Sequence, residues 1–216
     1  MTPPRLLGML PDIVCRSTYR FASAITIPMA KGSGSKEKTV AAAAKLFCQR
    51  GYHGTALFDI LASSGSPRGS LYFHFPRGKE EIAESAIALG EKEVRAFIAQ
   101  VAKTSRSAET FVINLARGMA ARLEASDFRE GCPLATTALE VAVDSEAIGK
   151  ATRTAFAAWE REIAQALKDF GISAKEAVSR ATAILSQLEG ALLLARIYRN
   201  PDPMRRAEHV LRLLVQ

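Results

Sequence analysis

The sequence has no apolar run long enough to cross a bilayer, and it has few aromatic residues. A membrane-spanning helix needs about 18–20 consecutive apolar residues, whereas the most apolar stretch, residues 192–195, is closed by Glu189 and Arg196. We therefore predict a buried helix there and no membrane partner. Aromatic residues make up 7% of the 216 residues, against 48% hydrophobic residues in total. This balance favours an Ala- and Leu-rich helical protein over a β-sandwich.

Cysteine is scarce as well, and its spacing excludes the usual metal centres. Cys15, Cys48 and Cys132 form neither a C-x-x-C pair nor a cluster with histidine. Three widely spaced cysteines fit a reducing cytoplasm better than a disulfide framework. Cys48 lies in a helical apolar pattern, which indicates a core residue. Cys132 lies in an expected loop, where a redox sensor and an inert thiol both remain open.

The sequence also lacks every common catalytic pattern. Paired carboxylates, a Ser-His-Asp order and a phosphate-binding loop are all missing, and the three histidines are dispersed. We predict no catalytic residues, no metal and no cofactor. An enzyme that uses a cavity in the helical part is the alternative, and turnover of a ligand would reveal it.

Positive charge is concentrated in one short segment of the sequence. Of the net charge of +7, residues 31–79 carry +6, because eight basic residues there face only Glu37 and Asp59. A compact basic segment beside a near-neutral remainder is typical of a DNA-binding module joined to a second domain. A solvated basic surface without a partner would give the same charge distribution.

The first thirty residues differ from the rest. They contain three prolines before position 12 and no sustained helical period, and a second methionine follows at Met29. The apolar stretches are too short for a secretory leader. We expect residues 1–30 to be a disordered extension or the product of an upstream start-codon assignment.

Helical periodicity begins at Ser35, which can cap a first helix that ends at Gly51. Thr55 can cap a short second helix, and the sequence Ser64-Gly65-Ser66 ends it. Pro67 suits the first position of a third helix that runs to Phe75. Two short helices joined by a glycine-containing turn form a helix-turn-helix, whose second helix enters the major groove of DNA.

The chain after Lys79 is helical almost throughout, so the fold class is all-α. We expect a three-helix DNA-binding domain over residues 31–78 and a helical ligand-binding and dimerisation domain over residues 79–216. Glycine, asparagine and proline mark the breaks. The expected helices after the third cover residues 79–101, 108–125, 134–143, 145–170, 174–198 and 203–215.

Residues 36–79 resemble the DNA-binding domain of the TetR family. The match includes an A-x-x-L-F-x-x-x-G-Y first helix, Gly65, and the run from Gly69 to Phe75 followed by Lys79. Residues 131–135, Gly-Cys-Pro-Leu-Ala, resemble the LmrA/YxaF-type branch. Ser64 and Ser66 depart from the pattern, because the family commonly has apolar residues there, and this predicts weaker packing at the turn.

The resemblance implies a set of DNA contacts. Arg68, Gly69 and Ser70 would approach bases, Tyr72 and His74 would contact phosphates or flanking bases, and Phe73 would touch a thymine methyl or pack on Phe75. Thr55 and Lys79 would hold backbone phosphates. The expected DNA-binding residues are Thr55, Arg68, Gly69, Ser70, Tyr72, Phe73, His74 and Lys79.

The resemblance also implies a homodimer and an effector pocket. Family dimers use the last two helices, and the matching apolar stripe consists of Ala181, Ile184, Leu185, Leu188, Leu192, Ala195 and Leu211. The expected pocket residues are Phe97, Met119, Leu123, Phe156, Trp159, Ile163 and Gln187. An ordinary intramolecular core would explain part of either set. Few ionisable residues fall in these stripes, which favours a neutral, lipophilic effector, although Glu140 and Glu189 could pair with a cation.

The implied function is a cytoplasmic, homodimeric repressor that binds a palindromic operator in double-stranded DNA and is released by a small lipophilic molecule. A ligand-independent regulator, or an activator without a functional pocket, is the alternative.

Overall fold

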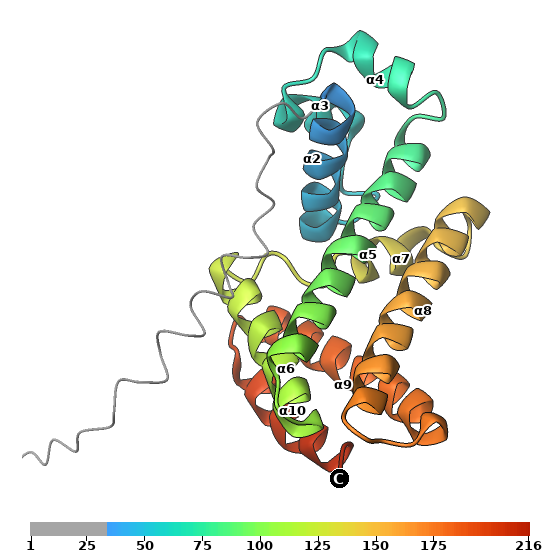
Figure 1. The fold of residues 1–216 in the computed structure, drawn as a ribbon. Coiled ribbons are helices and arrows are strands. Elements are labelled where there is room, and N and C mark those ends of the chain that lie inside the picture. Colours follow the sequence, from blue (N-terminus) through green and yellow to red (C-terminus); the bar gives the residue numbers. More distant parts are fainter. Residues whose placement is uncertain (1–33) are drawn as a thin grey trace, which may run out of the picture.

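The computed structural model describes residues 34–216, and every described element is a helix (Figure 1). The all-α prediction is confirmed. The expectations for residues 1–30, and the thiol of Cys15, lie outside the described residues. None of the described helices is both long and apolar enough to cross a membrane.

Three short helices gather around the start of a long one, at one end of the molecule in Figure 1. They are α2 (Ser35–Arg50), α3 (Leu57–Ser64) and α4 (Arg68–His74), and we call them the N-terminal unit. The long helix is α5 (Lys79–Thr104). Apolar residues at three- and four-residue steps form the core of the unit. Its core contains the fully buried Phe47, Ile60, Leu71 and Phe75, together with Ile82 of α5.

Two helix starts differ from the sequence expectation. The N-cap of α2 is Gly34 rather than Ser35, and the N-cap of α3 is Ala56 rather than Thr55. Thr55 does not cap because its hydroxyl turns back and donates to the carbonyl oxygen of Gly51 at 2.8 Å. The backbone N–H of Ala56 is instead held by the carboxylate of Asp59 at 3.3 Å.

Six helices form the rest of the described chain. Helix α5 runs unbroken from the N-terminal unit into a bundle with α6 (Ala108–Ala125), α7 (Ala135–Val141), α8 (Glu146–Asp169), α9 (Ala174–Tyr198) and α10 (Asp202–Leu213). Helix α8 packs between α5 and α9, and α10 packs on α6 and α9. Serine caps set three starts, because Ser107, Ser145 and Ser173 each accept a hydrogen bond from the backbone three residues later.

Gly51 closes α2 in a backbone conformation that other residues avoid, with φ 78° and ψ 177°. A Cβ at this position would overlap the carboxylate of Glu140 on α7. The same carboxylate accepts a hydrogen bond from the backbone N–H of His53 at 2.7 Å. Gly51 therefore allows the end of α2 to approach α7 closely.

Candidate nucleic-acid interface and enclosed cavity

Helix α4 presents aromatic and basic side chains to solvent. Tyr72 is 63% exposed and Phe73 is 81% exposed, whereas Leu71 on the opposite face is buried. Phe58 of α3 is 63% exposed, and the guanidinium of Arg68 lies over its ring at 5.7 Å. Large apolar side chains gathered on an exposed surface mark a site for a partner. This surface, formed by Phe58, Arg68, Tyr72 and Phe73, is called the α4 face.

The other predicted DNA contacts lie around the α4 face. A side chain added at Gly69 would meet open space, which leaves the backbone accessible. Ser70 lies within α4. The half-buried ring of His74 packs edge-on against Phe73, with ring centroids 5.1 Å apart. The Lys79 ammonium at the start of α5 lies 4.2 Å from the centre of the Tyr52 ring, and partial burial lowers its pKa while Glu140 raises it.

Thr55 does not fit its predicted role. Its side chain is completely buried, and its hydroxyl is engaged with the carbonyl of Gly51. The side chain therefore has no exposed atom to offer a phosphate, and the position serves to close the turn between α2 and α3. A motif match cannot show whether this threonine is buried or exposed, because the residue in the sequence is the same in both cases.

Ser64 and Ser66 hold the helix-turn-helix turn together instead of weakening it. The hydroxyl of Thr39 in α2 donates to Ser66 Oγ at 3.0 Å, and Ser66 Oγ donates to the carbonyl of Ser35 at 3.3 Å. The backbone N–H of Ser66 donates to Ser64 Oγ at 3.2 Å. Hydrogen bonds therefore take the place of the apolar contacts that the family pattern would supply. Thr39, almost fully buried, was missed because its role depends on a residue 27 positions away.

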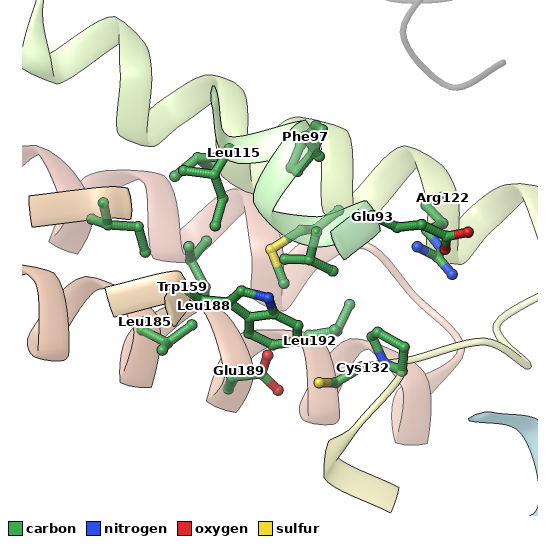
Figure 2. A pocket seen from close by; sticks show the side chains of 15 residues that line it. Glu93, Phe97, Leu115, Arg122, Cys132, Trp159, Leu185, Leu188, Glu189 and Leu192 are labelled. Atoms are coloured by element: carbon green, nitrogen blue, oxygen red, sulfur yellow. The ribbon is translucent and has the colours of Figure 1, made fainter. Parts of the chain in front are cut away.

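An enclosed cavity of about 60 Å³ lies between α5, α6, α8 and α9 (Figure 2). Four predicted pocket residues line it: Phe97, Met119, Trp159 and Ile163. The indole N–H of Trp159 donates to the carbonyl of Glu91 at 3.1 Å, which fixes the ring in the cavity wall.

Three predicted pocket residues lie elsewhere. Leu123 is buried in the core away from the cavity, and Phe156 packs edge-on against Trp159 with centroids 5.1 Å apart. Gln187 is half-buried but does not line the cavity. Helix α9 instead contributes its face of Leu185, Leu188, Glu189 and Leu192. Residue 187 lies about 100° from residue 188 around the helix. A correct helix assignment therefore does not determine which face of α9 points into the cavity.

The cavity wall carries three ionisable carboxylate and guanidinium groups. Glu93 and Arg122 lie together at one side, and Glu189 lies near the Trp159 ring on the other (Figure 2). Burial raises the pKa of Glu93, and the nearby Arg122 opposes this shift. Burial also raises the pKa of Glu189, and only a hydrogen bond from the Cys132 thiol opposes it. Glu189 is nonetheless partly exposed, because it also lines an open groove between α8 and α9.

The cavity wall is connected to the N-terminal unit. Cys132 of the wall follows Gly131, and the C-terminal turn of α2 is hydrogen-bonded to this loop, to α7 and to α9. We call these contacts the junction. They are Cys48 Sγ to the Gly131 carbonyl at 3.5 Å, Gln49 Nε2 to Glu130 at 2.9 Å, the His53 N–H to Glu140 at 2.7 Å, and Arg196 Nη2 to the Gln49 carbonyl at 2.9 Å.

The predicted dimer stripe lies inside a single chain. Leu185 is half-buried and lines the cavity, and the other six residues are fully buried: Ala181, Ile184, Leu188, Leu192, Ala195 and Leu211. They cannot also form an exposed contact surface, because α6, α8 and α10 already cover this face of α9. The exposed apolar side chains of α9 and α10 lie on another face. They are Val178, Leu193, Leu194, Ile197, Tyr198, Val210 and Leu213.

Comparison with known proteins agrees with this architecture. Residues 40–86 match the family model for bacterial regulatory proteins of the tetR family. Residues 108–210 match the C-terminal domain of LmrA/YxaF-like transcriptional regulators. The crystal structure of a TetR regulator from Legionella pneumophila superimposes with a TM-score of 0.74 at 22% identity, over 86% of this chain and all of that one. One from Rhodobacter sphaeroides gives 0.76 at 21% identity, over 84% and 99%.

Two curated relatives from Bacillus subtilis (strain 168) match over most of their length. The chain is 31% identical to the HTH-type transcriptional regulator LmrA, over 79% of this chain and 90% of LmrA. It is 32% identical to the uncharacterised HTH-type transcriptional regulator YxaF, over 82% and 92%. Sequence, helix order and the exposed α4 face thus agree. The chain belongs to the TetR family, in its LmrA/YxaF-like branch, and is a DNA-binding transcriptional regulator and not an enzyme.

Proposed function

We propose that the protein is a ligand-responsive repressor that binds its operator as a homodimer and is released when a small molecule occupies the cavity. The observation that supports this most directly is the position of the cavity. Cys132 in its wall adjoins Gly131, and the carbonyl of Gly131 accepts a hydrogen bond from Cys48 of α2. A molecule that displaces this loop acts on the helix next to the DNA-reading unit.

The α4 face reads DNA in this proposal. The α4 helices of the two protomers enter successive major grooves, about 34 Å apart along the DNA. The Arg68 guanidinium can donate to both acceptors of a guanine, and such a pair discriminates by about 1–3 kcal/mol. Phe73 contacts a thymine methyl, because it is too exposed to pack on Phe75. Lys79 supplies a phosphate contact, which adds affinity and salt dependence without sequence information.

The dimer forms through the exposed apolar side chains of α9 and α10. The C-terminal end of α9 carries four of these exposed side chains, Leu193, Leu194, Ile197 and Tyr198, and α10 contributes Leu213. Burying these side chains stabilises association by about 25 cal/mol per Å² of apolar surface, less the entropy lost on association. The two-fold symmetry of such a dimer matches a palindromic operator.

Release follows from a population shift. The effector binds a conformation whose junction differs from that of the DNA-bound form, so that the two α4 helices no longer match successive grooves. A ligand can shift this equilibrium only by the difference in its affinity for the two conformations.

The small cavity volume favours a second candidate, a regulator without an effector. About 60 Å³ holds only a few water molecules. The two candidates differ in one measurement. A regulator without an effector keeps the same operator affinity whatever small molecule is added, and its structure shows no enlarged cavity.

The test of DNA reading uses the full chain and a DNA fragment that contains the region upstream of its own gene. Arg68→Ala and Tyr72→Ala should each lower operator affinity about tenfold or more, because each removes a contact worth roughly 1–3 kcal/mol. Arg161→Ala is the matched control, since Arg161 is exposed on α8 far along the chain from α4. Unchanged affinity of both α4 variants, with folding intact by circular dichroism, would show that another helix reads the DNA.

A further inference from the structure

Glu189 is a carboxylic acid placed in an otherwise apolar part of the cavity wall. Around it lie Leu185, Leu188 and Trp159, and the Cys132 thiol is the one neighbour that favours its ionised form. No basic side chain within residues 34–216 forms an ion pair with it. Glu189 is partly buried, and a partly buried carboxylate without a cation loses hydration that a thiol, a weak donor, does not replace.

The other two charged groups of the wall compensate each other. Arg122 lies beside Glu93 and favours its ionised form. The cavity as a whole therefore has an excess of one negative charge when its carboxyls are ionised, and this excess belongs to Glu189. A ligand that supplies one positive charge at Glu189 would complete the site, whereas an anion would meet an uncompensated carboxylate.

Glu189 and Leu185, one helical turn apart on α9, also line an open groove on the outside of the bundle. This groove has a volume of about 480 Å³ and lies between α8 and α9, where Phe156 and Glu160 form its other wall. The two side chains thus lie between the cavity and this groove. Arg153 in the groove is already paired with Glu146 at 3.2 Å.

The volumes indicate how a ligand would enter. The enclosed cavity of about 60 Å³ takes only a few atoms, but cavity and groove joined reach the range of roughly 300–1,000 Å³ that is typical of ligand sites. Rotation of the Leu185 side chain would join them. Glu189 would then lie at the centre of one continuous site, with an apolar wall on the cavity side and a mixed polar and apolar wall on the groove side.

We propose that the effector site, on which the proposed function rests, takes a monocationic amphipathic amine. Its ammonium group pairs with Glu189 at the boundary between cavity and groove, and its apolar body lies against Trp159 and Phe97. The indole face adds an attraction for the cation. This proposal differs from the neutral, lipophilic effector expected from the sequence, and it follows the alternative in which Glu189 pairs with a cation.

The test compares three molecules with the same apolar body and different charge: 4-phenylbutylamine, 4-phenylbutan-1-ol and 4-phenylbutyrate. Trp159 is the only tryptophan of the chain, so its fluorescence reports binding, and calorimetry checks the affinities. Wild-type protein should bind the amine on the order of 10–100-fold more tightly than the alcohol, and the anion most weakly. Equal or tighter binding of the alcohol or the anion, or no binding of the amine at millimolar concentration, overturns the proposal.

Glu189→Gln keeps the side-chain size and should remove the preference for the amine while it retains the affinity for the alcohol. Glu124→Gln is the matched control, because Glu124 is exposed on α6 and lines neither the cavity nor the groove, and it should keep the preference. Loss of the preference in both variants alike, or in neither, contradicts the assignment to Glu189. Retained binding of the alcohol shows that each variant is folded.

Operator affinity, measured with and without each molecule, separates the two proposals. Release of the operator by the alcohol or the anion, without a preference for the amine, supports a ligand-responsive repressor and overturns the ligand class. Tight amine binding that leaves operator affinity unchanged supports the ligand class and contradicts ligand control of repression.

Discussion

Replacement of Gly51 by alanine should be much more harmful than the same replacement at Gly65, although both glycines end a helix with a positive φ. Gly51 has φ 78° and ψ 177°, a region that only glycine visits readily, and forcing alanine into it costs about 1–3 kcal/mol. The new Cβ would also overlap the Glu140 carboxylate. Displacing this carboxylate from the His53 N–H costs about a further 1–2 kcal/mol at this partly exposed position. The expected loss of unfolding free energy is therefore roughly 2–5 kcal/mol.

Gly65 provides the control. Its φ of 64° and ψ of 18° lie in the ordinary left-handed region, where alanine costs about 1–2 kcal/mol. A Cβ there would meet no atom within 4 Å. Gly65→Ala should thus lower the melting temperature by a few degrees, and Gly51→Ala on the order of 10 °C, at about 2–4 °C per kcal/mol for a chain of this size.

Urea unfolding of the two variants and of Glu140→Ala supplies the free energies. If the overlap is real, Glu140→Ala should cost less in the Gly51→Ala background than in the wild type, because the two residues are in contact and their effects are not additive. Equal destabilisation by the two glycine variants, or strict additivity with Glu140→Ala, would refute the close approach of α2 and α7.

Two further variants test the junction and the thiols. Arg196→Met removes the donor to the Gln49 carbonyl and should cost about 1–3 kcal/mol, with faster amide exchange in the last turn of α2; unchanged exchange would mean that this contact does not hold the helix. Burial raises the pKa of Cys48 to about 11 and that of Cys132 well above its usual range. A variant with Cys15→Ser leaves only these two thiols, and a disulfide reagent at pH 8 should modify neither before the protein unfolds. Rapid modification of the native protein would instead support the redox role considered for Cys132. The free energy of unfolding that is linked to the raised pKa of Cys48 is fully present below its ordinary pKa of 9.0 and is lost as the pH rises towards 11.

The sequence was most informative where local signals act alone. Helices α6 and α9 begin and end at the predicted residues, because the caps Ser107 and Ser173 and the breaks after each helix are local. The expected helix over residues 134–143 was too long at both ends, since α7 covers only Ala135–Val141. Its length is set by packing on α2 and α8 rather than by its own residues.

The site was predicted less completely than the helices that carry it. An apolar stripe on α9 shows which side chains avoid water, but it does not show whether its own chain or a second copy covers them. Ile184 and Leu188 are covered by their own chain, whereas Leu193, in the stretch 192–195 that was predicted to be buried, is exposed. The exposed Ile197 was not predicted as a contact residue. Glu189 shows the same limit, because one carboxyl in an apolar helix has the same sequence pattern at a surface and in a cavity.

Helix α5 connects the N-terminal unit directly to the cavity wall. It begins at Lys79, beside the N-terminal unit, and reaches the cavity wall at Glu93 and Phe97 without a break. The distance along the axis from Lys79 to Phe97 is about 27 Å, at 1.5 Å per residue. A tilt of about 5° at the cavity would therefore move the start of the helix by roughly 2 Å. In the homodimer proposed above both ends would move, so a displacement smaller than one side chain would change the spacing of the two α4 helices by several ångströms, against a groove repeat of about 34 Å.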